Sequence, residues 1–281
     1  MAATLPSPPA QRFGNLKTKI ATAVGAATVG LVLLYLGGVW AMLLIAGLAG
    51  AMAWEYRSVT LHRGGPCGFD AALLMGGVVG AVVVATFYSA PAALFWLLWM
   101  LAGSALADIF AGRRGAAVWG ALGGAYIGGA AIAFHYIRVQ DPFGFAAALW
   151  LFLVVAATDI GGYFAGRLVG GSKLWPHVSP KKTWAGLGGG IGLAVLVGAA
   201  FGHAVEGVSL LPVCAVSAAA AVISQGGDLA ESAVKRHFGV KDAGRLLPGH
   251  GGALDRFDGL LAASLAAGLL TWWRGETVFI W

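Results

Sequence analysis

Long apolar stretches follow one another along most of this chain, and they leave little sequence for a water-soluble fold. A membrane-spanning helix needs about 20 predominantly apolar residues. About nine stretches come close to that length, near residues 20–37, 39–55, 70–89, 91–109, 116–137, 144–165, 184–203, 209–226 and 258–275. Only 11% of the residues are charged, against about a quarter in soluble domains. The sequence therefore predicts an all-α, polytopic integral membrane protein.

The distribution of Lys and Arg predicts how these spans are oriented. With a cytoplasmic N-terminus and nine spans, the cytoplasmic segments hold 16 of the 18 basic residues, and only Arg138 and Arg274 fall on the other side. Cytoplasmic loops of membrane proteins carry an excess of Lys and Arg. We therefore expect a multi-pass protein of the cell inner membrane, with loop 166–183 and segment 228–258 facing the cytoplasm. The net charge of +6 mostly reflects this bias and does not indicate a nucleic-acid partner.

We expect three regions along the chain: a cytoplasmic segment 1–19, scaffold helices in 20–143 and a second membrane region in 144–281 that carries the functional site. The first five spans carry few charges, with Glu55 and Asp108 as exceptions. The region from about residue 144 onward holds most of the candidate functional groups.

The 45 glycines predict close contacts between helices. Small residues four positions apart let two membrane helices approach closely, and Gly124-xxx-Gly128 and Gly188-xxx-Gly192 have this spacing. In so glycine-rich a chain the spacing also arises often by chance.

Charged residues concentrate in segment 228–258, which apolar stretches flank on both sides. This segment holds 10 of the 30 Asp, Glu, Lys and Arg residues, namely Asp228, Glu231, Lys235, Arg236, Lys241, Asp242, Arg245, Asp255, Arg256 and Asp258. Placing such groups beside a bilayer costs free energy unless they bind a ligand. A phosphate group with its metal ion would be a suitable ligand. A solvated surface loop is the alternative. The Pro-Gly-His-Gly-Gly run at 248–252 disfavours it, because that run leaves backbone N–H groups free for a phosphate.

The carboxylates of this segment predict a magnesium site. Asp228 follows a predicted span, whereas Asp255 and Asp258 are three residues apart on one face of the next predicted helix. Hard oxygen ligands without a cysteine favour Mg²⁺ over zinc, and Mg²⁺ usually takes one or two carboxylates together with substrate phosphates. Asp228 and Asp255 are the predicted ligands, and Asp258 and Asp159 are weaker candidates.

Two further segments carry candidate groups. Asp159, Tyr163 and Arg167 are spaced along one helix face. Asp159 is either functional or pairs with Arg167 in a structural role. The run Ser179-Pro-Lys-Lys-Thr183 precedes a predicted span, where free N–H groups and lysines suit a phosphate. An ordinary basic flank of a membrane helix is the alternative for this run.

Segment 228–258 resembles the signature of the CDP-diacylglycerol synthases, also called phosphatidate cytidylyltransferases. That pattern is Ser-x-x-Lys-Arg, four residues, Lys-Asp, and then Pro-x-His-Gly-Gly-x-x-Asp-Arg-x-Asp. The residues in register are Ser232, Lys235, Arg236, Lys241, Asp242, Pro248, His250, Gly251, Gly252, Asp255, Arg256 and Asp258. The 179–183 run and the Asp159–Arg167 segment are also similar to the family. Ala185, Ala253 and Gly259 depart from its usual residues.

The resemblance implies that CTP and phosphatidic acid react at the cytoplasmic face of the bilayer to give CDP-diacylglycerol and pyrophosphate. It implies Mg²⁺, a possible second cation and a possible homodimer. The residues expected to be catalytic are Asp228, Asp255, Lys235 and Asp258, with Asp228 and Asp255 as metal ligands. The residues expected to bind substrate are Lys181, Lys182, Ser179, Arg236, Lys241, His250, Arg167 and Asp159.

Three other classes of protein remain open from the sequence. A CTP-dependent lipid-alcohol kinase would share the metal and nucleotide sites. A secondary transporter would use Asp159 and Asp228 as coupling-ion sites. A structural membrane subunit would leave the charged segment unexplained.

Overall fold

The computed structural model describes residues 24–61, 69–244 and 251–279. The predicted cytoplasmic segment 1–19 and the candidate residue His250 lie outside the described residues. The described helices are Val24–Leu36, α2 (Gly38–Thr60), α3 (Phe69–Phe87), α4 (Ala90–Phe110), α5 (Arg114–Arg138), α6 (Gly144–Leu168), α7 (Trp184–Ala204), α8 (Leu210–His237) and α9 (Leu254–Arg274). Two short strands, β1 (Lys173–Trp175) and β2 (Ser179–Thr183), connect α6 to α7.

Seven of the described helices, α2 to α8, are long and apolar enough to cross a membrane. This number confirms a polytopic membrane protein and is smaller than the predicted nine. Helix Val24–Leu36 is too short over its described part. The ninth predicted span does form a helix, α9, but it is not among these seven, and Asp255, Arg256 and Asp258 make its first turns polar.

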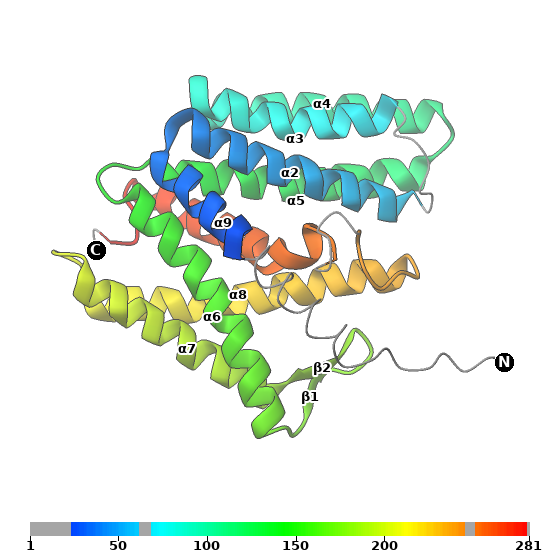
Figure 1. The fold of residues 1–281 in the computed structure, drawn as a ribbon. Coiled ribbons are helices and arrows are strands. Elements are labelled where there is room, and N and C mark those ends of the chain that lie inside the picture. The colour runs from blue at the N-terminus through cyan, green and yellow to red at the C-terminus, as the bar shows by residue number, and fades with distance from the viewer. Residues whose placement is uncertain (1–23, 62–68, 245–250, 280–281) are drawn as a thin grey trace.

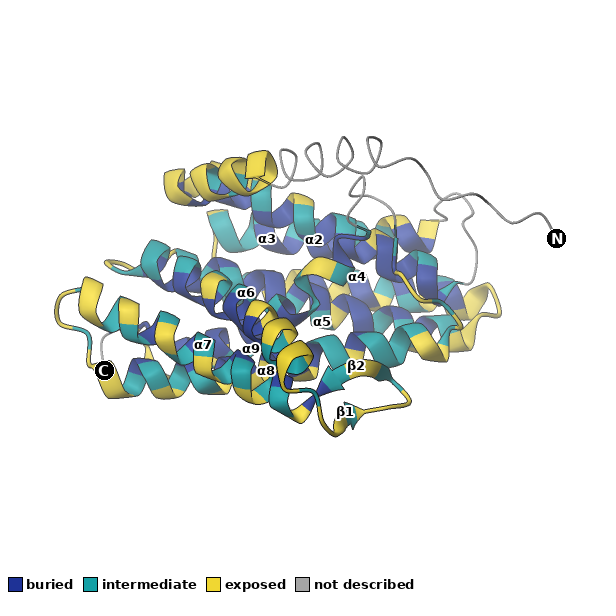
Figure 2. Ribbon diagram, turned by 60° about the horizontal axis from the view of Figure 1, so that its bottom comes forward, coloured by how far each residue is buried: buried dark blue, intermediate teal, exposed yellow. Residues whose placement is uncertain are grey.

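Helix α4 illustrates how one sequence serves both protein and lipid. Ser89 caps its N-terminus by accepting a hydrogen bond from the Ala92 N–H at 3.3 Å. The buried residues recur every three or four positions, as Ala93, Leu97, Leu101, Ser104 and Asp108. The opposite face exposes large apolar side chains, including Leu94, Phe95, Leu98 and Trp99. Figure 2 shows that exposed residues also cover helix Val24–Leu36, as expected for surfaces that contact hydrocarbon.

The helices form two groups, with α9 between them (Figure 1). Helices α2 to α5 pack together in one group, and α6 to α8 form the other. Helix α9 packs against both α5 and α8, so that Leu261 belongs to the apolar core of the first group and Ala263 to that of the second. The position of α9 therefore depends on both groups.

Helices α6 and α7 pack through small residues. On α7 the buried residues are Gly186, Gly190, Ala194 and Gly198, four positions apart. A Cβ atom on Gly190 would lie 2.7 Å from the Thr158 carbonyl oxygen of α6, whereas one on Gly188 would meet nothing within 4 Å. The predicted pair Gly188-xxx-Gly192 is therefore wrong, because these residues lie on the open face of α7. The pair Gly124-xxx-Gly128 is confirmed, since both glycines face side chains of the neighbouring helices.

Replacement of Gly190 by alanine is expected to destabilise the protein, because the new methyl group forces the backbones of α6 and α7 apart. Overpacking of this kind costs about 1–3 kcal/mol. The matched control is Gly188→Ala, which adds the same group to the same helix in open space and should leave stability unchanged or slightly higher. Thermal unfolding of the purified protein in detergent measures both. Equal effects of the two variants would contradict this account of the packing.

A two-stranded antiparallel hairpin interrupts the helices between α6 and α7. Strand β2 continues directly into α7, where the Thr183 hydroxyl caps the helix by accepting a hydrogen bond from the Gly186 N–H at 3.0 Å. The sequence predicted a loop here. The all-α prediction is confirmed for the helices, and this hairpin is an addition that holds Lys181 and Lys182 on a strand.

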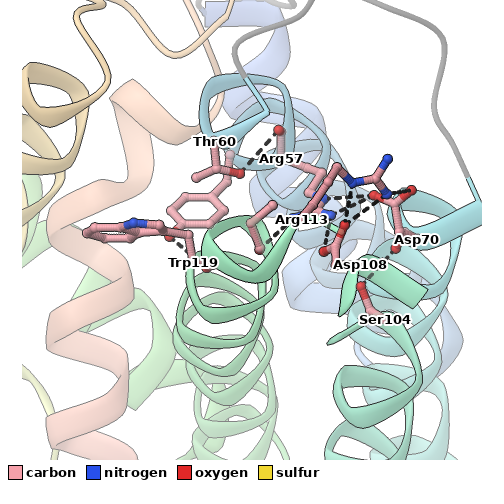
Figure 3. A network of polar contacts seen from close by, with 9 residues as sticks. Arg57, Thr60, Asp70, Ser104, Asp108, Arg113 and Trp119 are labelled. Carbon is pink, nitrogen blue, oxygen red and sulfur yellow. Dashed lines mark hydrogen bonds and ion pairs between the residues drawn. The ribbon is translucent and has the colours of Figure 1, made fainter. Parts of the chain in front are cut away.

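A buried charge cluster, which we call the Arg57 clasp, joins the ends of four helices (Figure 3). It consists of Arg57 of α2, Asp70 of α3, Asp108 of α4 and Arg113, which precedes α5. The Arg57 guanidinium lies 2.6 Å from Asp70 and also bonds Asp108, and it donates a further hydrogen bond to the Ala116 carbonyl oxygen at 3.0 Å. The hydrogen bond to Asp108 raises the pKa of Arg113, so this cation stays charged. The clasp therefore connects the C-terminal end of α2 to α3, α4 and α5.

Candidate active site

A cavity of about 350 Å³ opens between α6, the β1–β2 hairpin, the start of α7, and α8. Its lining brings together five of the predicted site residues, Asp159, Arg167, Lys181, Lys182 and Asp228. These residues come from three separate segments of the chain. The cavity therefore brings the Asp159–Arg167 segment and the 179–183 run together with Asp228, the first carboxylate of segment 228–258.

Lys182 and Asp228 form the closest charge contact of this cavity. The Lys182 ammonium lies 2.6 Å from Asp228 Oδ2, and both side chains are partly buried. The Ser232 hydroxyl, one helical turn further along α8, donates to the other oxygen of Asp228 at 3.3 Å. Gln225, one turn earlier, donates its amide to Asp159 Oδ1 at 3.2 Å. The side chains of α8 thus orient a carboxylate on each side of the cavity.

Arg167 and Asp159 have different partners in the structure. Arg167 donates a hydrogen bond to the Tyr163 hydroxyl at 2.7 Å, whereas Asp159 accepts one from Gln225. The alternative in which Asp159 serves only as the structural partner of Arg167 is therefore wrong. Arg167 is exposed and lines the cavity, where its guanidinium adds positive charge for an anionic ligand.

A second charge cluster lies further along α8, where Lys235 joins two carboxylates. Its ammonium is 2.6 Å from Glu231 Oε2 and 2.6 Å from Asp255 Oδ1. Asp255 also accepts hydrogen bonds from the backbone N–H groups of Ala243 and Gly252, at distances of 3.0 to 3.1 Å. Burial favours the neutral acid, but the bonds from Lys235, Ala243 and Gly252 outweigh it and lower the pKa of Asp255. Asp255 is therefore a carboxylate at neutral pH.

Asp258 lies near carboxylates of both clusters. It lies one turn after Asp255 on α9, within electrostatic range of Asp228, Glu231 and Asp159. Its backbone carbonyl accepts a hydrogen bond from the Tyr126 hydroxyl of α5 at 3.3 Å. The charges of Asp159, Asp228 and Glu231 thus all act on Asp258, while Lys182 pairs with Asp228 and Lys235 with Glu231.

Three predicted substrate-binding residues do not line the described cavity. Ser179 lies at the start of β2, opposite Trp175. Arg236 is exposed and donates to the Val240 carbonyl oxygen at 3.3 Å, and Lys241 is exposed in the turn that follows α8. Their roles stay predictions, as does that of His250.

A smaller apolar cavity of about 200 Å³ lies on the other side of α8. Tyr56, Trp119, Leu122 and Tyr126 line it together with apolar residues of α8 and α9, and Glu231 and Lys235 also border it. The cavity therefore has mostly apolar walls, and the Lys235 cluster borders it.

Comparison with known sequences identifies the family of the chain. The sequence model described as the cytidylyltransferase family matches residues 17–272. This chain belongs to the cytidylyltransferase family. The predicted family is confirmed, and the match extends through the N-terminal helices, which the residues quoted for the resemblance do not reach.

Several relatives of this cytidylyltransferase-family chain carry the name phosphatidate cytidylyltransferase. One from Brucella suis biovar 1 is 40% identical over 254 residues, which cover 90% of this chain and 92% of the relative. One from Bacillus subtilis is 43% identical over 144 residues, or 48% of this chain and 51% of the relative. One from Staphylococcus epidermidis is 45% identical over 138 residues, or 49% of this chain and 52% of the relative.

The candidate ligands in this site are hard oxygen donors. Within the residues that the structure describes, no group of three or more His, Cys, Asp or Glu side chains is arranged to hold a metal by itself. Mg²⁺ commonly takes only one or two carboxylates and completes its shell with water and substrate phosphates. Glu231 Oε1 is buried without a hydrogen-bond partner among the described residues, so a carboxylate oxygen beside Lys235 is available to bind a cation. The chemistry of the donors therefore agrees with Mg²⁺.

Sequence reasoning missed several residues that shape this site. Gln225 orients Asp159, Tyr126 contacts α9, and Glu55 of α2 accepts a hydrogen bond from the first residue of α9. A buried acidic residue in an apolar stretch was the signal available for Glu55, because such residues are rare in membrane helices and usually functional. Nothing in the sequence alone marked its partner, which is 199 residues away.

Proposed function

We propose that this chain transfers the cytidylyl group of CTP to phosphatidic acid, giving CDP-diacylglycerol and pyrophosphate. The observation that supports it most is the cavity in which Lys181, Lys182 and Arg167 meet the carboxylates Asp159 and Asp228, in a chain of the cytidylyltransferase family. The names of the relatives supply the lipid substrate.

The proposed chemistry needs charge neutralisation more than proton transfer. The phosphate of phosphatidic acid is already an anion at neutral pH, and its oxygen attacks the α-phosphorus of CTP. A new P–O bond forms, and the bond from the α-phosphorus to the bridging oxygen breaks, so that pyrophosphate leaves with both electrons. Lys181, Lys182 and Arg167 reduce the repulsion between the two anions, and positioned positive charge of this kind supplies most of the catalysis in phosphoryl transfer.

Mg²⁺ is part of the proposal. Asp228 and Asp255 would hold it, with Asp258 and Asp159 as weaker ligands, and a second cation is possible. When bound, Mg²⁺ would neutralise phosphate charge. The catalytic assignment covers Asp228, Asp255, Asp258 and Lys235. Lys235 keeps Asp255 in place and adds a positive charge beside it.

The lipid is expected to reach the site from the bilayer. The apolar cavity bordered by Tyr56, Trp119 and Leu122 suits part of an acyl chain, and it ends beside Lys235, where the phosphate head group would lie. We place this end of the helices on the cytoplasmic side, because the predicted cytoplasmic segments carry most of the Lys and Arg. The N-terminus would then also be cytoplasmic, with nine spans in total. The catalytic region 144–281 and a homodimer complete the proposal.

The test is an assay in detergent with purified protein, CTP, Mg²⁺ and phosphatidic acid. Formation of a CDP-lipid and pyrophosphate, with CTP preferred over ATP, GTP and UTP, is the expected result. Release of CDP with a polyprenol acceptor would instead indicate a lipid-alcohol kinase. Substrate turnover that needs sealed vesicles and an ion gradient would indicate a transporter. Light scattering of the solubilised protein tests the homodimer.

A further inference from the structure

Glu55 connects the N-terminal helices directly to the start of α9. Its side chain is almost fully buried at 3% exposure, and its Oε2 accepts a hydrogen bond from the Leu254 N–H at 2.8 Å. Leu254 is the first residue of α9, and the preceding Ala253 provides no side-chain cap. The first N–H groups of a helix lack partners within the helix, and a carboxylate there is favourable. Glu55 therefore caps α9 from another part of the chain.

The same carboxylate packs against the backbone on both sides of the segment that precedes α9. Cβ atoms built on Gly244 or Gly252 would clash with the Glu55 carboxylate, so only glycine allows this approach. Asp255 binds the neighbouring N–H groups of Ala243 and Gly252. Two carboxylates thus hold the two ends of residues 243–252, one from α2 and one from α9.

The end of α2 that carries Glu55 is itself firmly held. Arg57, two residues later, belongs to the Arg57 clasp, and the intervening Tyr56 donates a hydrogen bond to the Trp119 carbonyl oxygen of α5 at 3.0 Å. The other oxygen of Glu55, Oε1, is buried without a hydrogen-bond partner among the described residues. Among the described residues, the Glu55 carboxylate therefore accepts its hydrogen bond from the first residue of α9.

We propose that Glu55 is a positioning residue for the transfer reaction. By fixing the first turn of α9 against the rigid end of α2, it sets the position of Asp255 relative to Lys235. This inference rests on the proposed function, because it assigns Asp255 to the reacting centre. It also gives the N-terminal helices a role in the site, in addition to their role as a scaffold.

Glu55→Ala and Glu55→Gln separate positioning from charge. Gln keeps an oxygen that accepts from the Leu254 N–H, whereas Ala has none. In the detergent assay, Glu55→Ala should lower kcat and raise the Mg²⁺ concentration for half-maximal rate, each by about 10-fold or more, as loss of an outer-shell partner of a metal site does. Glu55→Gln should remain within about threefold of the unchanged protein, since the hydrogen bond survives. Ser58→Ala, a nearby change on the exposed side of α2, should have no effect.

Hydrogen exchange without metal or substrate gives a readout independent of activity. In Glu55→Ala, backbone amides of residues 251–256 should exchange about tenfold faster or more, because the hydrogen bond to the Leu254 N–H is lost. Amides of α6 and α7 should be unchanged, and Glu55→Gln should resemble the unchanged protein. Faster exchange throughout the molecule would overturn the proposal, because Glu55 would then serve general stability.

Gly244→Ala tests the same contact from the other side, even if Glu55→Ala does not fold. The added methyl group would press on the Glu55 carboxylate and should reproduce the kinetic and exchange defects. In the Glu55→Ala background the space is open, so the second change should add little. Additive effects would overturn the proposal, as would normal kcat and Mg²⁺ dependence in Glu55→Ala. If the wild-type protein makes no CDP-lipid, the proposed function fails. If the wild-type protein is active and the Glu55→Ala variant is equally active, only the positioning role is refuted.

Discussion

Asp255→Asn is expected to reduce CDP-lipid formation by about 10²–10³-fold, the range found when one preorganised electrostatic contact is removed from an active site. The change keeps the size of the side chain and removes its charge. It weakens the contact with Lys235 at 2.6 Å and takes away a proposed Mg²⁺ ligand. Pyrophosphate release from CTP in detergent, measured over a range of Mg²⁺ concentrations, checks the prediction.

Two controls distinguish this loss of function from a loss of structure. Asparagine still accepts a hydrogen bond from Ala243 or Gly252, so the melting temperature of Asp255→Asn should remain close to that of the unchanged protein. Glu206→Gln removes the same charge at an exposed position after α7, outside the described cavity, and should leave turnover unchanged. Near-normal turnover of Asp255→Asn would remove Asp255 from the reacting centre.

The sequence predicted the helices well because the bilayer imposes a simple rule. Backbone groups in hydrocarbon must bond within the segment, so long apolar stretches become helices. The rule was less successful at α9, where Asp255, Arg256 and Asp258 make the first turns polar. That polarity reflects the site that α9 carries, between the two groups of helices.

The helix faces that pack together could not be read from glycine spacing. Gly186-xxx-Gly190 and Gly188-xxx-Gly192 have the same pattern on one helix, yet only the first pair faces α6. The choice depends on the position of Thr158 on the neighbouring helix, which the α7 sequence does not contain. A pattern within one helix predicts that a close contact is possible, and the partner decides where it forms.

The charged segment was predicted as a site because its residue types and spacing were specific. Which lysine contacts which carboxylate was not predicted. Asp228 and Asp255 are the predicted metal ligands, and in the structure each also contacts a lysine, Lys182 for Asp228 and Lys235 for Asp255, which the sequence did not predict. Lys182 comes from the β1–β2 hairpin, and the Lys235–Asp255 contact depends on the packing of α9 against α8. Contacts between segments so distant in sequence depend on the packing of whole helices, and local spacing carries no information about them.

Arg57→Ala is expected to cause the largest loss of stability, about 3–5 kcal/mol, because it leaves buried charges without their partner. The side chains of Arg57, Asp70 and Asp108 are 2%, 6% and 1% exposed. Without Arg57, Arg113 is the one cation among the described residues that still pairs with the two buried carboxylates, and its side chain is 43% exposed. Thermal unfolding or titration with a denaturing detergent measures the loss.

Further variants in and beside the Arg57 clasp test whether unpaired buried charge causes this loss of stability. Arg114→Ala removes a neighbouring exposed cation and should change stability by less than about 0.5 kcal/mol. Adding Asp108→Asn to Arg57→Ala removes the excess negative charge and should recover part of the loss, so the two changes should be clearly non-additive. If the double variant is instead destabilised by the sum of the single effects, the loss comes from packing of the Arg57 side chain. Because α2, α3, α4 and the start of α5 meet at this cluster, recovery by Asp108→Asn would also establish that charge pairing holds these four helices together at the end where Glu55 contacts α9.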